Sequence, residues 1–258
     1  MVKEDSYFHP QYWEKTKELD EVLPFQDEVL AYYKEYEGKM KKPDLWGKTV
    51  HVTAQQFPKV YECLKELAES AEIKIPNLFL YEDFYYGAEA KGSDSFRIEM
   101  SAKTLADFSP VAVKFLLARE ICRIKWGMVK LATISEHTLS MIEATNILPG
   151  METFAKGLTV HYSQWSRLAN YTADCYGYMV TKNLGECVNT ILALVLNNQN
   201  LVKQLNIREY LAQAQEIYLL DDIVSRYSQN DEKIPYGPLR IKNLLAYAAS
   251  KKLAKEID

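Results

Sequence analysis

The sequence predicts a mostly helical α+β fold. Apolar residues recur at helical spacing through most of the 258-residue chain. Three short segments rich in β-branched and aromatic residues, at 49–53, 78–81 and 96–101, predict strands instead. With 48% hydrophobic residues, a chain of this length can bury a full core. We therefore expect a small sheet followed by a helical C-terminal part.

The first forty-odd residues predict a pair of helices. Their aromatic and apolar side chains recur near helical spacing, and Leu23-Pro24 divides the segment because a residue before proline disfavours helix. Residues 38–47 are rich in lysine and contain Pro43, which indicates a linker. The chain is accordingly divided into an N-terminal helical extension, residues 1–46, and a main domain, residues 47–258.

The main domain is expected to start with a strand, a helix and two further strands. The first helix covers residues 58–72, between the strands at 49–53 and 78–81. Helices are then expected at residues 111–127, 131–146, 157–182, 187–196, 207–227 and 239–255, with residues 149–150 ending the second and a polar turn at 197–200.

Charged residues interrupt the apolar helix expected at 111–127. Arg119, Glu120 and Arg123 form the pattern R-E-x-x-R. Alone, this pattern is typical of a solvated helix face or of intrahelical ion pairs. Here the surrounding residues are strongly apolar, and buried charges must be paired or solvated. The sequence therefore predicts a site on this helix, with Glu120 paired to an arginine.

The same pattern stands where a zinc-peptidase helix has H-E-x-x-H. In that motif the two histidines, one turn apart, hold the metal, and the glutamate is the general base. Arginine stays protonated and carries only donors, so it has no lone pair for a metal. We therefore expect no metal and no cofactor at this helix.

Three further motifs occur in the same order as in a known family. Residues 87–92 read G-A-E-A-K-G where the family has N-A-F-x-x-G, residues 166–174 read S-R-L-A-N-Y-T-A-D for S-R-x-x-E-x-x-A-D, and residues 234–240 read I-P-Y-G-P-L-R for H-P-x-x-x-x-R. With the R-E-x-x-R helix, they make residues 47–252 resemble the HtpX and CAAX prenyl endopeptidase family of zinc metallopeptidases.

The resemblance implies a zincin-like core with a small β-sheet packed on the helix at 111–127. It also assigns roles, which are expectations here. Arg119, Arg123 and Asn170 occupy the three metal-ligand positions, Glu120 the general base, Ile234 and Arg240 the substrate-facing positions, and Asp174 and Arg167 the surrounding support. All three ligands and the substrate-facing histidine are replaced while neighbouring framework residues remain. The chain is therefore interpreted as a pseudopeptidase.

The residues at the three metal-ligand positions have charges that fit together. Arg119 and Arg123 bring two positive charges to the helix face where a zinc peptidase has its cation. With Glu120 and Asp174 nearby, guanidinium groups replace that cation electrostatically, and bidentate arginine–carboxylate geometry suits the role. Neutral Asn170, in place of a glutamate, keeps the site from becoming too acidic.

Three classes of function follow. The first is binding or regulation of a protein or peptide through the inherited cleft, where an extended peptide adds to an edge formed by Gly87, Ala88, Glu89 and Ala90. The second is an enzyme with an unusual site, for example with Cys122 or Cys175 as a thiol whose pKa nearby arginines lower. The third is a scaffold, a homo-oligomer whose tyrosine-rich N-terminal helices supply the contacts.

Composition excludes several partners. A net charge of −4 and an isoelectric point near 5.7 argue against nucleic acid. No apolar run is long enough for a membrane span, and the charged N-terminus lacks a secretory signal, so a cytoplasmic location is expected. The four histidines show no metal-binding spacing.

Overall fold

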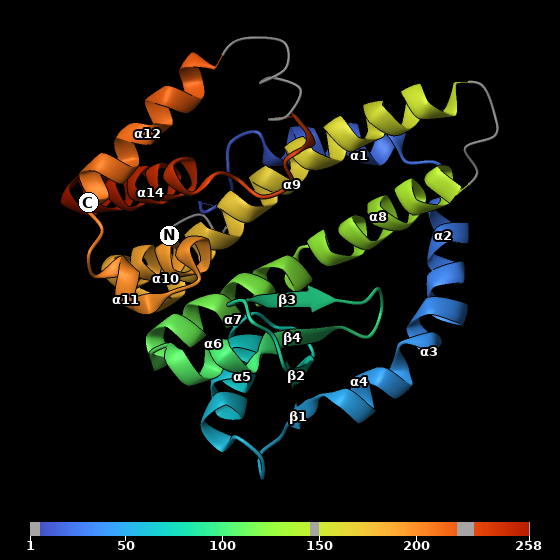
Figure 1. Cartoon of the computed structure of the whole chain (residues 1–258), viewed down its shortest axis with the longest axis horizontal. Coiled ribbons are helices and arrows are strands. Elements are labelled where there is room, and N and C mark those ends of the chain that lie inside the picture. The colour runs from blue at the N-terminus through green and yellow to red at the C-terminus, as the bar shows by residue number, and fades with distance from the viewer. Residues whose placement is uncertain (1–5, 145–149, 221–229, 258) are drawn as a thin grey trace.

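The computed structural model describes residues 6–144, 150–220 and 230–257. It confirms a mostly helical α+β fold with one small mixed sheet (Figure 1). The N-terminal half contains α1 (Tyr12–Val22), α2 (Gln26–Tyr32), a π-helical turn η1 (Tyr33–Glu37), α3 (Gly38–Met40), α4 (Lys42–Lys48), β1 (Val50–Val52), α5 (Pro58–Ser70), β2 (Asn77–Tyr81), β3 (Ala88–Lys91), β4 (Arg97–Ser101) and α6 (Ala102–Asp107).

The rest of the described chain is helical. It contains α7 (Pro110–Lys125), α8 (Met128–Ala144), α9 (Met151–Thr181), α10 (Leu184–Leu196), α11 (Gln199–Val202), α12 (Ile207–Leu219) and α14 (Gly237–Ile257). No helix among the described residues is both long enough and apolar enough to cross a membrane.

The sheet has the strand order β1-β2-β4-β3. β2 and β4 run parallel, whereas β1 and β3 are antiparallel to their neighbours. Central β2 buries Leu78, Phe79 and Leu80 in succession, as expected for a strand covered on both faces. β3 is an edge strand, and it packs beside α7 and α8 (Figure 1). The sheet therefore presents the edge of β3 to the helices.

The helix α7 lies at the centre of the molecule, with α9 on one side and β3 on the other (Figure 1). Ser109 caps its N-terminus by accepting a hydrogen bond from the Ala112 amide, and Pro110 occupies the first turn. Gly127, at φ 69°, follows its C-terminal end. Eleven of its sixteen residues are buried, including Arg119 and Glu120, so this helix brings charge into the core.

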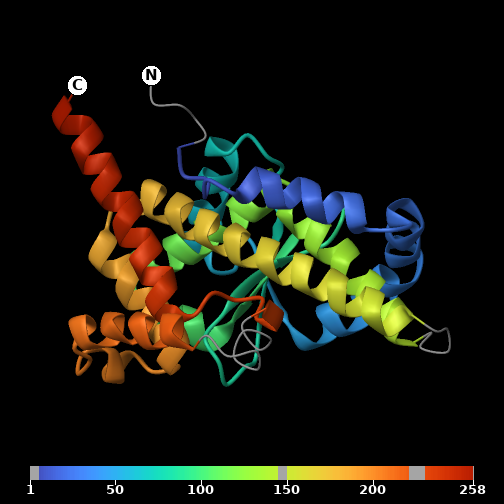
Figure 2. The same cartoon turned by 90° about the horizontal axis from the view of Figure 1, so that it is seen from above.

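The N-terminal helices share that core. α1 lies along α9, as Figures 1 and 2 both show, and it buries Tyr12 and Leu19 in the same apolar cluster as the main domain. Trp126, just after α7, donates its indole N–H to the Tyr7 hydroxyl at 2.7 Å. The N-terminal segment is therefore bonded and packed to the centre of the fold.

Residues 38–47, expected as a linker, are mostly helical. These residues form α3 and most of α4. Pro43 lies in the first turn of α4, where its missing N–H has no cost, and ion pairs one turn apart join Lys48 to Asp44 and Lys39 to Glu35. Lysine and proline here stabilise a helix rather than ending one.

Other boundaries also differ from the prediction. α9 begins at Met151, six residues before the expected start, because Gly157 lies in open space on an exposed face and the helix passes through it. α12 ends at Leu219, and residues 221–227 of the expected helix lie outside the described residues. Pro149, expected to help end a helix, also lies outside them, whereas Gly150 precedes α9 at φ 90°.

Gly177 of α9 allows α7 and α9 to pack closely. A Cβ at this position would lie 2.6 Å from Cδ2 of Phe115 and 3.2 Å from Cγ of Arg119. Phe115 is fully buried and has no room to retreat. We expect Gly177→Ala to lower the free energy of unfolding by about 1 to 3 kcal/mol through overpacking, measured by urea denaturation.

The matched control is Gly157→Ala in the same helix. Nothing lies within 4 Å of a Cβ there. That change should raise the free energy of unfolding by about 0.5 to 1 kcal/mol, since alanine favours helix over glycine. Equal stabilisation by both substitutions would contradict the close packing of α7 on α9.

Candidate functional site

A cleft of about 540 Å³ opens between α7, α9, β3 and the segment before α14. It gathers most of the residues that the sequence analysis singled out. Arg119, Glu120 and Arg123 from α7, Asn170 from α9, Gly87, Ala88 and Glu89 at β3, and Ile234 and Arg240 all line it. Segments separated by more than a hundred residues therefore meet at one place.

Asp174 lies behind this cleft, fully buried, between two arginines. Its Oδ1 is 2.6 Å from Nε of Arg119, an ion pair without an aligned hydrogen bond. Arg240 donates from Nε to Oδ2 at 2.5 Å and from Nη2 to Oδ1 at 2.8 Å, which is a bidentate contact. We call these three residues the Asp174 clamp. It joins α7, α9 and α14.

The two arginines of the clamp differ in electrostatic environment. Burial lowers the pKa of Arg119, and the positive charge of Arg240 lowers it further. Burial also opposes charge at Arg240, but its contacts with Asp174 outweigh this, so the pKa of Arg240 is raised. The negative charge of Asp174 therefore stabilises the charged form of Arg240 more than that of Arg119.

Asn170 supplies a neutral oxygen to the less compensated arginine. Nη2 of Arg119 donates to Oδ1 of Asn170 at 3.0 Å, and the Asn170 amide donates to the Ser166 carbonyl, also at 3.0 Å. The side chain is thus oriented by its own helix. A carboxylate at this position would have added negative charge, which asparagine does not.

Glu120 connects α7 to the edge strand. Its Oε2 accepts the backbone N–H of Ala90 at 2.8 Å and lies 3.5 Å from Nη1 of Arg123. The expected ion pair of Glu120 with an arginine of its own helix is therefore confirmed. Burial opposes the charge of Arg123, but Glu120 outweighs it and the pKa of Arg123 is raised. The second oxygen, Oε1, is buried without a hydrogen bond among the described residues.

Three predicted residues do not line the cleft itself. Asp174 lies behind it, and Ala90 contacts it only through Glu120. Arg167 donates from Nη1 to the Glu232 carbonyl at 2.6 Å, which anchors the segment leading to Ile234. Ile234 lines the cleft but is 59% exposed, so its side chain is at the rim rather than in the floor.

A second hollow, of about 390 Å³, adjoins the cleft and extends it along β3. The two share Glu89, Arg123, Glu136 and Tyr162 in their linings. The first borders residues 87–89 and the second residues 89–91. Together they form one groove, which we call the β3 groove, along the whole length of the edge strand.

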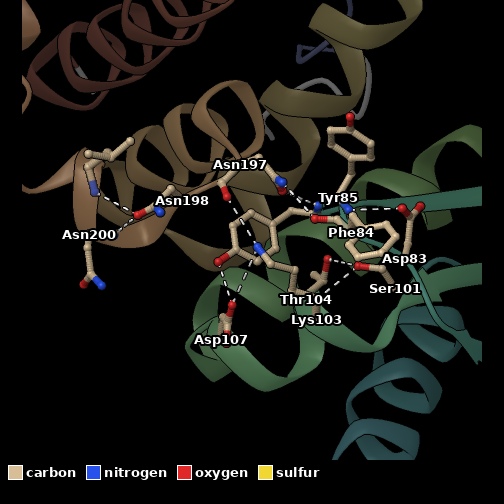
Figure 3. A network of polar contacts seen from close by, with 12 residues as sticks. Asp83, Phe84, Tyr85, Ser101, Lys103, Thr104, Asp107, Asn197, Asn198 and Asn200 are labelled. Carbon is tan, nitrogen blue, oxygen red and sulfur yellow. Dashed lines mark hydrogen bonds and ion pairs between the residues drawn. The ribbon is translucent and has the colours of Figure 1, made fainter.

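The contacts that hold the loop before β3 were not predicted from the sequence. Asn197, just after α10 at φ 50°, donates to the Phe84 carbonyl at 2.8 Å and accepts from the Tyr86 amide at 2.9 Å (Figure 3). Lys103 donates to the Asn197 carbonyl and lies 3.4 Å from the centre of the Tyr86 ring. The polar turn at 197–200 was the only sequence signal of this anchor.

The same loop is also fixed to α6, the helix that follows β4. The Tyr86 hydroxyl donates to Asp107 at 2.6 Å, and the Gly87 amide donates to the Thr104 hydroxyl at 2.8 Å. Phe84 and Tyr85 at its tip are 82% and 68% exposed. The loop therefore holds the start of β3 in place and presents two aromatic side chains to solvent.

The residues at the predicted ligand positions do not fit a zinc ion. Arg119, Arg123 and Asn170 line one cleft, as the resemblance requires, but guanidinium groups cannot coordinate a metal. Among the described residues, no three histidine, cysteine, aspartate or glutamate side chains come together as a metal site. The floor of the cleft, formed by Arg119, Glu120, Arg123, Asn170 and Arg240, is instead held together by ion pairs between arginines and carboxylates.

The expectation of a lowered thiol pKa is wrong for both cysteines, although Arg119 and Arg123 partly offset the effect of burial at Cys122. Cys122 and Cys175 are buried, and burial raises the pKa of each thiol well above its ordinary value. A buried thiol of raised pKa is a poor nucleophile. Both therefore act as small apolar side chains in the core.

Comparisons of this chain with protein-family models, with curated proteins and with solved structures found no match.

The Asp174 clamp should be essential for stability. Asp174→Asn leaves two buried guanidinium groups without their carboxylate, so we expect the free energy of unfolding to fall by about 3 to 5 kcal/mol. Urea denaturation measures it. Glu152→Gln is the control on the same helix, where the Lys156 ion pair is exposed, and it should cause no measurable change. A loss under about 1 kcal/mol for Asp174→Asn would contradict the clamp.

Proposed function

We propose that this chain is a pseudopeptidase, which holds an extended segment of a peptide or protein in the β3 groove and does not cut it. The single observation that carries the proposal is that the edge of β3 borders a groove along its whole length. Extended peptides bind such edges through backbone hydrogen bonds, with side chains entering adjacent pockets.

The hydrogen bonds of β3 indicate which of its backbone groups face the groove. Ala90 donates its N–H to Glu120, not to β4, so this residue points to the outer edge. In an antiparallel pair, alternate residues point to the same side, which places Ala88 on that edge too. The amide and carbonyl of Ala88 and the carbonyl of Ala90 are therefore the groups offered to a bound strand.

The floor of the groove supports binding without cleavage. A zinc peptidase needs a metal and a general base, and here arginines stand at two ligand positions. Glu120, at the position of the base, already accepts from Ala90 and lies beside Arg123. Its Oε1 makes no hydrogen bond among the described residues, but without a metal to lower the pKa of a bound water Glu120 has no activated water to deprotonate. We infer a zincin-like core on the sequence resemblance and on this arrangement of α7 beside the edge strand.

The alternative functions have less support. An enzyme using a cysteine is disfavoured by the raised pKa values of Cys122 and Cys175. A scaffold based on N-terminal tyrosines would need them at the surface, yet Tyr7, Tyr12 and Tyr33 are buried within this chain, which leaves only Tyr32 and Tyr36 of the N-terminal tyrosines exposed. Binding in the groove remains the function with a specific structural basis.

Removing the outer amide of β3 should weaken binding. A random decapeptide library displayed on mRNA would supply binders of the wild type, which are then synthesised with a fluorescent label. We expect Ala88→Pro to weaken their binding by about tenfold or more in fluorescence anisotropy, because proline has no N–H to donate. Ala88→Val keeps the amide and is the matched control, with a smaller loss expected.

The same peptides should stay intact on incubation with the protein, as followed by mass spectrometry. Cleavage that a chelator abolishes would contradict the proposal and favour a metallopeptidase. The proposal that peptides pair with the edge of β3 would also be contradicted if the library yields no binder. Equal affinity of the proline and valine variants for the peptides would contradict it as well.

A further inference from the structure

The buried charges at the cleft do not balance. Among the described residues, its floor and the layer directly behind it contain three arginines, Arg119, Arg123 and Arg240, and two carboxylates, Glu120 and Asp174. Their side chains range from 0% to 17% exposed, so water screens this group weakly. One positive charge is left without a partner carboxylate.

The surplus lies at the Asp174 end. Glu120 is next to Arg123, which makes that pair neutral. Arg119 and Arg240 share the single charge of Asp174, and the other contact of Arg119 is with neutral Asn170. The lowered pKa of Arg119, which follows from burial and from Arg240, is consistent with a guanidinium short of negative charge.

The acidic residues at the rim have cationic partners of their own. Glu136 accepts the Tyr162 hydroxyl at 2.8 Å and lies 3.7 Å from Nζ of Lys233. Glu89 lies 3.4 Å from Nζ of Lys91. These pairs leave the rim close to neutral, and the charges of Glu89 and Glu136 act on Arg123 rather than on Arg119 or Arg240, so they do not cancel the surplus at the Asp174 end.

We propose that the Arg119–Arg240 end of the cleft binds a carboxylate of the bound peptide, either its C-terminal carboxylate or an aspartate or glutamate side chain. Where a related peptidase would hold a cation, this chain selects an anionic group. The inference rests on the proposed function and names the chemistry that its ligand carries.

The geometry suits a carboxylate. Each guanidinium has five N–H donors in a planar fork, and the contacts with Asp174 and Asn170 use only part of them. Both arginines line the cleft, which continues into the groove along β3. A peptide paired with β3 thus brings its carboxylate to donors already held in position by the Asp174 clamp, which lowers the entropic cost of binding.

Asn170→Asp tests the charge directly. The substitution is nearly isosteric and places a carboxylate beside Arg119. This carboxylate should neutralise the positive charge that otherwise has no partner. Asn206→Asp is the control, because Asn206 caps α12 by accepting from backbone amides and does not line the cleft. Aspartate caps equally well, so the control has the same net charge with the cleft unchanged. Arg119→Gln is a second variant, which removes the surplus and leaves Arg240 bidentate on Asp174.

The probes are the labelled library peptides, each made with a free C-terminus, with a C-terminal amide, and with its aspartates and glutamates changed to amides. On the wild type and on Asn206→Asp, neutralising the relevant carboxylate should weaken binding about tenfold or more, the size of a charge-assisted hydrogen bond. On Asn170→Asp and Arg119→Gln that difference should disappear. Loss on C-terminal amidation identifies the terminus, and loss on side-chain amidation identifies an acidic residue.

Peptides that bind equally well in charged and neutral forms would overturn the carboxylate site and leave the peptide-binding function standing. An equal loss on Asn206→Asp would also overturn it, because the effect would then come from net charge. If no peptide binds the wild type, the proposed function itself fails.

Discussion

The buried carboxylate of Asp174 is the interaction on which the rest of the site depends. It fixes Arg119 of α7 and Arg240 of α14 from its position on α9, so three helices distant in sequence meet at one charged group. Burying such a group is costly, and only close, multiple contacts offset the cost. The position of the cleft floor follows from this clamp, and Gly177, one turn further along α9, allows α7 to approach closely enough to form it.

The charged residues of the cleft floor also hold the edge strand β3 in position. Glu120 extends the same network to the edge strand by binding the Ala90 amide, so the charged helix also positions β3. From the other end, Asn197 and Thr104 hold the loop that leads into β3. A strand fixed at both ends offers its outer edge in a defined position, which favours pairing with a peptide over movement of the strand itself.

Much of this site could be predicted from the sequence. An apolar helix with Arg119, Glu120 and Arg123 had to pair its charges, and the ordered motifs placed Asn170 and Arg240 beside them. The local sequence pattern did not predict the features that depend on contacts between segments distant in the chain. The bond from Ala90 to Glu120 and the anchor at Asn197 join segments distant in sequence, and residues 38–47 form helices stabilised by pairs that composition alone did not reveal.

We propose that this floor has the layout of a metal site, with guanidinium groups in place of the cation. The most direct measurement is zinc binding by the triple variant Arg119→His, Arg123→His and Asn170→Glu, by elemental analysis and calorimetry. The account predicts about one zinc ion per folded chain, because these positions line one cleft with the helix spacing that two histidines need. A triple variant that folds, as judged by circular dichroism, but binds no zinc would contradict it.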